Sequence, residues 1–264
     1  MAIGIITGSA AHSLPGIESA VLHDVETPYG AALVSQGTVS GVDVLHISRH
    51  GEGHARLSNH VNHRANIWAL AELGARAVIS CTACGAVERD LTLGSLIFFD
   101  DLHFLSNRLP DGSLCTFSTE AGHHERAHWI IGPAYCDDLR KVLVAAAQRA
   151  GIHGRDGGCY GHVDGPRFNT ASEIRTLASV GVTAVSQTAG PEAVLCGEAE
   201  IPFALMGYAT DYANGVSEQP TPIEELSRLM TSSAAAFGAV LGQALPAIDV
   251  EALTPPGVVY RFHD

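Results

Sequence analysis

The chain has 264 residues and a mass of 27.6 kDa, and its 15 lysine and arginine residues against 28 aspartate and glutamate residues give a formal net charge of −13. An acidic chain without a Lys/Arg-rich run is a poor partner for nucleic acid, because binding to the phosphate backbone depends on clustered cations. No stretch approaches the roughly 20 consecutive apolar residues of a membrane span, and the start of the chain lacks the basic segment of a signal peptide. We therefore expect a cytoplasmic protein with no nucleic-acid or membrane partner.

Apolar residues make up 46% of the chain, a fraction typical of globular proteins. The length fits one large α/β domain, and no Pro/Ser-rich linker divides it. We expect a single domain over residues 1–250, followed by a C-terminal tail over residues 251–264.

Short β-rich runs alternate with helical patterns along the chain. The expected strands are 3–7, 44–48, 77–81, 94–99, 159–163, 182–187 and 202–209. The expected helices are 58–73, 133–150, 170–179, one that opens at Pro191, and 222–245. Ser58 is a candidate N-cap, and the tail from Pro255 is expected to be a loop or a packing strap. The alternation predicts an α/β fold with a largely parallel sheet that is covered by helices on both faces.

Small polar residues stand at or just past the carboxyl ends of the expected strands. In open α/β sheets, ligands bind at that edge. The residues concerned are Ser9, Arg49, His50, Thr82, Thr188 and Asp211. Their shared position predicts that they converge on one site.

Several of these side chains suit an anion of the size of phosphate. Ser9, Thr82 and Thr188 supply hydroxyl donors, Arg49 supplies a planar fork, and His50 can add a donor. A structural salt bridge is the alternative interpretation of an isolated arginine, but the strand-end setting favours the anion site.

Asp211 follows an apolar strand, which predicts a carboxyl group at the rim of a buried pocket. Desolvation there would raise its pKa and make a proton available to a ring nitrogen. A cap or turn is the alternative role. Phe168 is a candidate stacking platform, with a place in the core as its alternative.

Cys81 and Cys84 have CxxC spacing, which raises redox or zinc chemistry as a further interpretation. A zinc site needs two more ligands at a matching spacing, and no second CxxC or HxxxH follows. We expect the six cysteines to be free thiols and expect no metal site.

An ordered series of motifs resembles the trimeric purine nucleoside phosphorylases, and most closely their methylthioadenosine phosphorylase branch. The motifs lie at residues 3–9, 26–30, 48–51, 61–70, 82–85, 165–168, 191–193 and 209–212. Each motif is weak alone, whereas the series, which runs in order over about four-fifths of the chain, is specific.

The resemblance implies roles for individual residues. Phosphate would be bound by Ser9, Arg49, His50, Thr82, Thr188 and the backbone of Ala83. The nucleoside would contact Phe168, Asn169, Gln187, Asp211 and, at the 5′ end of the sugar across a subunit boundary, His128. Of these, Asp211, Arg49 and His50 would be catalytic.

The same resemblance implies a mixed, partly barrel-like β-sheet surrounded by helices, and a homotrimer with shared active sites. It implies no metal or organic cofactor, with inorganic phosphate as co-substrate. Phosphate would stabilise and then capture the positive charge that develops on the sugar as the C1′–N9 bond breaks. Asp211 would share a proton with N7 of the leaving purine.

The expected activity is phosphorolysis of 5′-methylthioadenosine or another 5′-modified adenosine, which yields adenine and a ribose 1-phosphate derivative. Two departures from the family pattern bear on this. Gln187 replaces a methionine that packs under the sugar, and Ala213 replaces a second aspartate at the base. The alternatives are a phosphorylase for 6-oxopurine nucleosides (inosine, guanosine or methylthioinosine), a hydrolase that uses water, and a non-catalytic nucleoside-binding protein.

Overall fold

The computed structural model describes residues 1–9, 14–121 and 127–262. The helices are α1 (His63–Glu72), α2 (Asp137–Arg149), α3 (Ala171–Ser179), α4 (Ala189–Glu198) and α5 (Ile223–Ala244), with short 3-10 turns η1 (Glu52–His54), η2 (Ser58–His60) and η3 (Leu245–Ala247). The strands are β1 (Ala2–Thr7), β2 (Glu18–Thr27), β3 (Gly30–Val39), β4 (Val42–Ser48), β5 (Ala75–Ala86), β6 (Leu96–Phe98), β7 (Asp101–His103), β8 (Ala127–Ile130), β9 (Gly154–Asp156), β10 (Cys159–His162), β11 (Val182–Ser186), β12 (Phe203–Tyr212) and β13 (Val258–Arg261).

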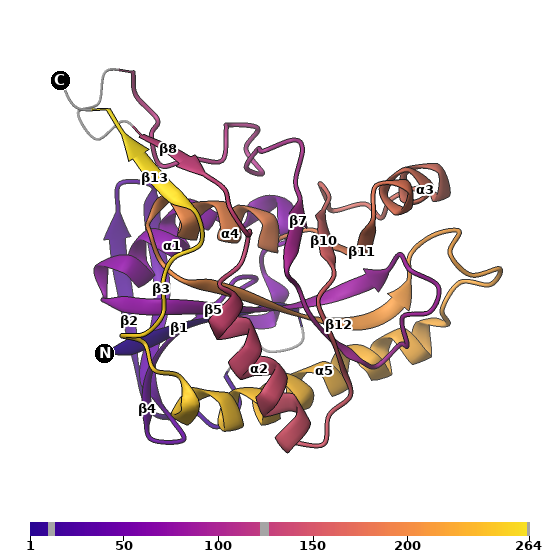
Figure 1. Ribbon diagram of the computed structural model, residues 1–264, viewed down its shortest axis with the longest axis horizontal. Coiled ribbons are helices and arrows are strands. Elements are labelled where there is room, and N and C mark those ends of the chain that lie inside the picture. The colour runs from indigo at the N-terminus through magenta and orange to yellow at the C-terminus, as the bar shows by residue number, and fades with distance from the viewer. Residues whose placement is uncertain (10–13, 122–126, 263–264) are drawn as a thin grey trace.

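One mixed sheet of 11 strands organises the molecule, with the order β2-β3-β4-β1-β5-β11-β10-β7 (Figure 1). The 12-residue strand β5 is long enough to pair with three neighbours: β1 and β12 in parallel, and β11 antiparallel. Strand β12 continues to β6 and β9. The sheet therefore branches at β5 instead of staying open and flat, which agrees with the expected mixed, partly barrel-like sheet.

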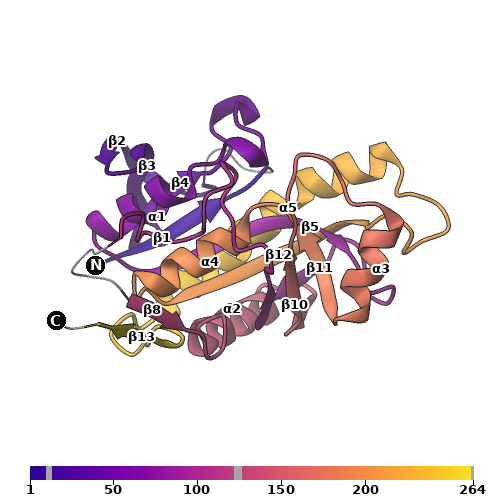
Figure 2. The ribbon, with the colours of Figure 1, turned by 90° about the horizontal axis from the view of Figure 1, so that it is seen from above.

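Apolar side chains on the two faces of the sheet form two separate cores. Because side chains alternate along a strand, Ile5 of β1 belongs to the core that α2 and α5 cover, whereas Ile6 belongs to the core that α1 and α4 cover. Figure 2 shows α4 and α2 on opposite sides of the strands. A third, smaller cluster joins Ile174 of α3 to Val182 and Val185 of β11. The expectation of a sheet covered on both faces is confirmed.

The structure corrects several expected boundaries. The helix expected from Ser58 begins at His63, because Val61 is extended and the Asn62 side chain caps the helix by accepting from the backbone N–H of Ala65. Strands β5 and β12 run past Thr82 and Asp211, so these two residues lie within strands and not after them. The tail expected as a loop or strap contains strand β13, which pairs with β8.

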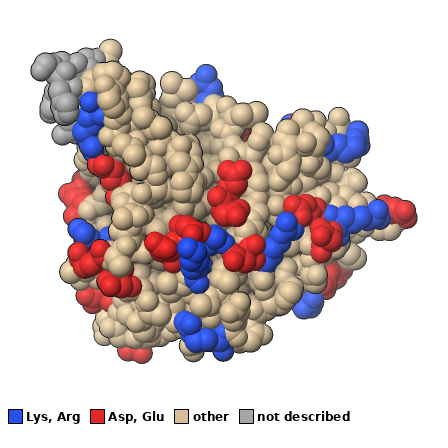
Figure 3. All heavy atoms as spheres, viewed as in Figure 1, with Lys and Arg blue, Asp and Glu red and all other residues tan. Residues whose placement is uncertain are grey.

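Acidic and basic side chains are interspersed over the middle of the face that α2 occupies (Figure 3). Lys141 of α2, for example, pairs with Asp137 at 2.6 Å. Among the helices of the described residues, none combines the length and the hydrophobicity that crossing a bilayer requires.

Candidate active site

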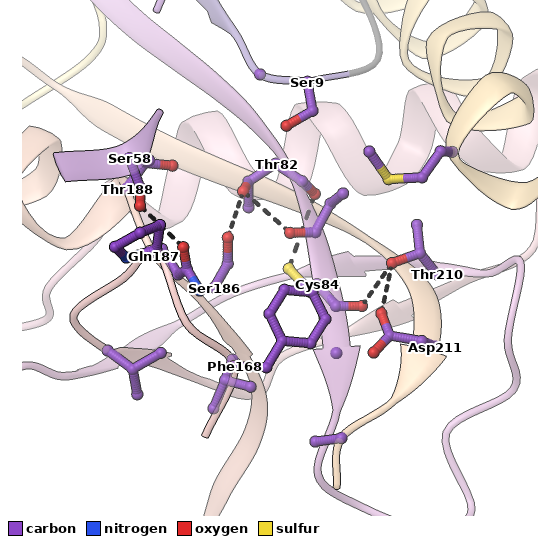
Figure 4. A pocket seen from close by; sticks show the side chains of 18 of the residues that line it. Ser9, Ser58, Thr82, Cys84, Phe168, Ser186, Gln187, Thr188, Thr210 and Asp211 are labelled. Carbon is purple, nitrogen blue, oxygen red and sulfur yellow. Dashed lines mark hydrogen bonds between the residues drawn. The ribbon is translucent and has the colours of Figure 1, made fainter. Parts of the chain in front are cut away.

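A pocket of about 350 Å³ opens where the chain leaves β1, β4 and β11 and where β5 and β12 run side by side. It gathers nearly every residue that the sequence singled out as a ligand-binding candidate. Those that line it are Ser9, Arg49, His50, Thr82, Ala83, Phe168, Asn169, Gln187, Thr188 and Asp211 (Figure 4). The predicted convergence on one site is therefore confirmed, although Thr82 and Asp211 reach the pocket from within strands and not from strand ends.

Arg49 is the centre of a buried polar network at one end of the pocket, with 1% of its surface exposed. Its Nε and Nη2 atoms each lie 2.9 Å from a carboxylate oxygen of Glu192. Nη2 also donates to Ser80 Oγ at 2.5 Å, and Ser80 donates to the same carboxylate at 2.7 Å. Burial raises the pKa of Glu192, while Arg49 and Ser80 oppose that shift. The salt-bridge interpretation of Arg49 is thus met, and its role at an anion site stays a prediction.

The remaining nitrogen of the guanidinium, Nη1, points toward the pocket. It donates to Thr188 Oγ1 at 3.0 Å. A Cβ atom on Gly8 would come within 3.2 Å of Nη1, so glycine at this position lets the β1 loop approach the guanidinium. Thr82 Oγ1 lies 2.9 Å from Ser186 Oγ on the neighbouring strand. Hydroxyl groups and Nη1 of Arg49 therefore surround a space fit for an oxyanion.

His50 lies beside this network, and its hydrogen bonding differs from expectation. Burial, and secondarily Arg49, lower the pKa of His50 to about 4, so the ring is neutral near pH 7. Nδ1 lies 2.8 Å from the carbonyl of Arg56, which can only accept, so Nδ1 carries the proton. Nε2 of the neutral ring is then an acceptor. In this tautomer the ring therefore offers a ligand an acceptor instead of the expected donor.

Asp211 occupies the other end of the pocket. Thr210 Oγ1 donates to Oδ1 of Asp211 at 2.8 Å, and Oδ2 lies against Gly85, where a Cβ would come within 3.4 Å. Burial raises the pKa of Asp211, and the bond from Thr210 opposes the shift. The expected desolvated carboxyl group is present, and its exchange of a proton with a ligand stays a prediction.

Phe168 and Asn169 lie on the segment that joins β10 to α3. The Phe168 ring is 65% exposed, so the core interpretation is wrong and its face is available to a flat ligand. The carbonyl of Asn169 accepts from the amide of Asn214, at 2.7 Å. This bond ties the segment to the chain just beyond Asp211.

His128 is the one expected site residue that one subunit does not bring to the pocket. It lies exposed on β8, with its ring 5.4 Å from that of Phe262. Its distance from the pocket in one chain is compatible with the expected role across a subunit boundary, which stays a prediction.

Several pocket residues were not anticipated. Ser58, Ser186, Leu57, Leu226 and Met230 line the pocket, and Glu192 holds Arg49 from behind it. Glu192 belongs to the Pro-Glu-Ala motif and could have been paired with the arginine. Nothing in the periodicity of residues 222–245 indicates that Leu226 and Met230 face a cavity.

The CxxC pair does not form a thiol site. Cys81 and Cys84 lie three residues apart on β5, so their side chains point to opposite faces and enter different cores. Burial raises the pKa of Cys81 to about 12 and that of Cys84 further still. All six cysteines are free thiols, as expected.

Comparison with known proteins agrees with this geometry. The family model described as the Phosphorylase superfamily matches residues 2–246. The 6-oxopurine nucleoside phosphorylase of Pyrococcus furiosus is 33% identical over 252 residues, which cover 94% of each chain. The S-methyl-5′-thioadenosine phosphorylase of Geobacter sulfurreducens is 31% identical over 263 residues, which cover 98% of this chain and 90% of the relative.

Solved structures give the same result. Methylthioadenosine phosphorylase from Schistosoma mansoni, in complex with adenine, superposes with a TM-score of 0.84 and 26% identity, over 95% of each chain. From the family model and these relatives, the chain belongs to the phosphorylase superfamily.

Proposed function

We propose that the chain cleaves the N-glycosidic bond of 5′-methylthioadenosine or another 5′-modified adenosine with inorganic phosphate, and releases adenine and a ribose 1-phosphate derivative. The class of reaction follows from the family, since both groups of relatives are purine nucleoside phosphorylases. One observation carries the proposal: an oxyanion cradle and a desolvated carboxyl group occupy opposite ends of one pocket.

The phosphate would lie among Ser9, Thr82, Thr188 and Nη1 of Arg49, with the backbone N–H of Ala83 as a further donor. In this position it would face C1′ of a sugar that spans the middle of the pocket. As the bond to N9 lengthens, the phosphate charge stabilises the sugar cation and then captures it. The separation of the two ends of the pocket is therefore the separation of nucleophile and leaving group.

Asp211 favours adenine as the leaving base. A protonated carboxyl offers one donor and one acceptor side by side, which complements N7 and the 6-amino group of adenine. A 6-oxopurine presents two acceptors, N7 and O6, at the same edge, so one contact would be repulsive. A hydrogen-bond mismatch in a desolvated site discriminates strongly between such substrates.

Apolar side chains support a 5′ substituent without charge. Leu57, Leu226 and Met230 line the pocket together with the polar groups. A thioether or a deoxy carbon gains by burial against such surface, whereas a phosphate would lose hydration.

A 6-oxopurine nucleoside phosphorylase is the second candidate. Relatives with that name are among the most similar, and the family's second aspartate is Ala213, which lies in the small apolar cluster with Val185 and Ile174. The base edge thus carries a single carboxyl group. Comparison of adenine and hypoxanthine release separates the two candidates.

We further propose a homotrimer in which His128 reaches the 5′ end of a neighbour's substrate. Near β8, the aromatic residues Tyr29, Trp68, Phe117 and Trp129 line a second hollow of about 1020 Å³, a surface suited to a second copy of the chain. The proposed reaction takes place in the cytoplasm and needs phosphate but no metal or organic cofactor. Sedimentation of the purified chain tests the trimer, and a monomer would overturn it.

The activity is tested by base release from 5′-methylthioadenosine, 5′-deoxyadenosine, adenosine and inosine, each with and without phosphate. Phosphate-dependent adenine release supports the proposal. Hypoxanthine release alone favours the 6-oxopurine candidate, and release without phosphate favours a hydrolase. Binding of a nucleoside without turnover would indicate a non-catalytic protein and overturn the proposal.

A further inference from the structure

Gln187 lies beside Ser58 and Thr188 in the pocket wall (Figure 4), and its amide links this side of the pocket to Arg167, next to Phe168. It follows β11 directly, and its neighbours in the chain each serve the oxyanion cradle: Ser186 contacts Thr82, and Thr188 contacts Arg49. Its own side chain instead bonds to the backbone of Arg167, which precedes Phe168. A sugar between phosphate and purine would therefore lie over Gln187.

Two hydrogen bonds fix the orientation of the Gln187 amide. Nε2 donates to the backbone carbonyl of Arg167 at 3.0 Å, and Oε1 accepts from Ser58 Oγ at 2.9 Å. A carbonyl oxygen can only accept, so the NH2 group must face Arg167 and the amide cannot flip. Ser58, of which 8% is exposed, lines the same pocket and has not been assigned a role.

The backbone is shaped to admit this pair. A Cβ atom on Gly165 would come within 2.1 Å of Gln187 Oε1 and 2.2 Å of Ser58 Oγ. No larger residue can occupy position 165 unless the bond between Ser58 and Gln187 is broken. The contact between Ser58 and Gln187 therefore depends on glycine at position 165.

The anchored amide retains binding capacity. Among the hydrogen bonds between described residues, Gln187 uses one of its two N–H groups and one of the two lone pairs of Oε1. One donor and one acceptor remain on a side chain that lines the pocket. The 2′ and 3′ hydroxyls of a ribose offer the matching acceptor and donor on adjacent carbons, which a methionine thioether could not pair with.

We propose that the side-chain amide of Gln187 hydrogen-bonds to the 2′ and 3′ hydroxyls of the ribose. Ser58 is the positioning residue that fixes the orientation of this amide. This inference rests on the proposed function, because it takes a nucleoside sugar as the ligand. The expected substrates are ribonucleosides, and we expect Gln187 to discriminate against 2′-deoxy and 3′-deoxy nucleosides.

The test compares binding of 5′-methylthioadenosine with that of its 2′-deoxy and 3′-deoxy analogues, by calorimetry in phosphate-free buffer. The variants are Gln187→Met, which keeps the length of the side chain, and Ser58→Ala. Gln148→Met, on the exposed face of α2, is the matched control. Thermal unfolding of each variant verifies that it is folded.

For the unaltered chain we expect the better-bound deoxy analogue to bind about 10- to 100-fold more weakly than the ribonucleoside. Gln187→Met should weaken binding of the ribonucleoside alone, so that the ratio of the dissociation constants of the deoxy analogue and the ribonucleoside falls to within about threefold of unity. Ser58→Ala should reduce the ratio partly, because the amide keeps its bond to Arg167. Gln148→Met should leave it unchanged. In the presence of phosphate, the same loss should appear in KM and not in kcat.

An unchanged ratio in Gln187→Met would overturn the inference, as would an equal loss of affinity for ribo and deoxy nucleosides, which indicates a purely structural role. If Gln187→Met does not fold, an unchanged ratio in Ser58→Ala overturns it. Base release is measured separately, so a chain that binds with the expected ratios but releases no base refutes the proposed function alone.

Discussion

The two ends of the pocket are built in opposite ways. At the oxyanion end, Arg49, Thr188 and Glu192 are at most 3% exposed and bond to one another from β4, β11 and α4. At the other end, which we propose binds the purine and call the purine end, Phe168 is 65% exposed on a connecting segment, and Asp211 is the one carboxyl group among the described residues that line the pocket. The oxyanion end is therefore buried in the core, whereas the purine end combines an exposed ring with a half-buried carboxyl group.

The contrast suggests where substrate choice can change. Exchange of Arg49 or Glu192 would disturb the core, because it would leave a buried charge without its partner. A residue of the purine end can be exchanged at little cost in stability. Such a division allows members of the family to use the same nucleophile with different purine bases.

The sharpest way to break this contrast is Arg49→Ala. The change leaves Glu192 buried without its partner, so we expect a loss of about 3–5 kcal/mol in the free energy of unfolding, together with loss of phosphate-dependent turnover. Arg228→Ala, which removes an exposed pair with Glu225 on α5, should have little effect on the free energy of unfolding, because water screens an exposed ion pair. Urea denaturation measures both. Equal midpoints for the two variants would contradict a core role for Arg49.

The two ends should also respond to acid in opposite senses. Burial lowers the pKa of His46, which bonds to Thr7 beside the oxyanion end, to about 4. Between pH 6.5 and 4 the unfolded chain takes up a proton that the folded chain refuses, so stability is full above pH 6.5 and falls by about 3 kcal/mol toward pH 4. Burial raises the pKa of Asp211, so its contribution is present at low pH and is lost as pH rises.

Unfolding by urea at several values between pH 7 and pH 4 measures the difference. His46→Gln keeps a polar side chain beside Thr7 and should flatten the decline. An equally steep decline in that variant would assign the acid sensitivity to other groups, among them His50, whose pKa burial also lowers to about 4.

Asp211→Asn tests the purine end. Asparagine cannot pass a proton to N7, so we expect turnover of adenine nucleosides to fall by more than about tenfold, while relative use of 6-oxopurine nucleosides improves. The ratio of kcat/KM for adenosine and inosine is the measurement, and unchanged selectivity would refute the role of Asp211. Stability at neutral pH should not decline, because a desolvated carboxyl group is removed.

Phe168→Ala is expected to have the smallest effect. Loss of a stacking face should raise KM for the nucleoside by roughly fivefold to tenfold, without a change in KM for phosphate. The free energy of unfolding should stay within about 0.5 kcal/mol, because the ring is exposed. A parallel rise in KM for phosphate would show that the two ends are not independent.

The sequence predicts the oxyanion end better than the rest, for a physical reason. Ser9 and Arg49 each follow a buried apolar strand closely, and the ends of the parallel strands β1 and β4 meet at one edge. Thr188 follows β11, which is antiparallel to β5, so this argument does not place it. The bond between Ser58 and Gln187 spans 129 residues and has no local signal.

The hairpin of β2 and β3 also escapes prediction. Residues of β2 are exposed or half-buried throughout, so the alternation of apolar and polar residues that marks a half-buried strand is missing. Strand β13 is formed by antiparallel pairing with β8, a contact between distant parts of the sequence. The match to the family model ends before this strand, at residue 246.

The pairing of Arg49 with Glu192 has a consequence for how phosphate arrives. A guanidinium already neutralised by a carboxylate presents a dipole, whose field falls off faster with distance than that of a free charge, on a chain that is acidic as a whole. Long-range electrostatic attraction of phosphate is therefore expected to be weak, and binding would depend on short-range hydrogen bonds within the pocket. Phosphate affinity should then vary little with ionic strength, and the anion should exchange readily between turnovers.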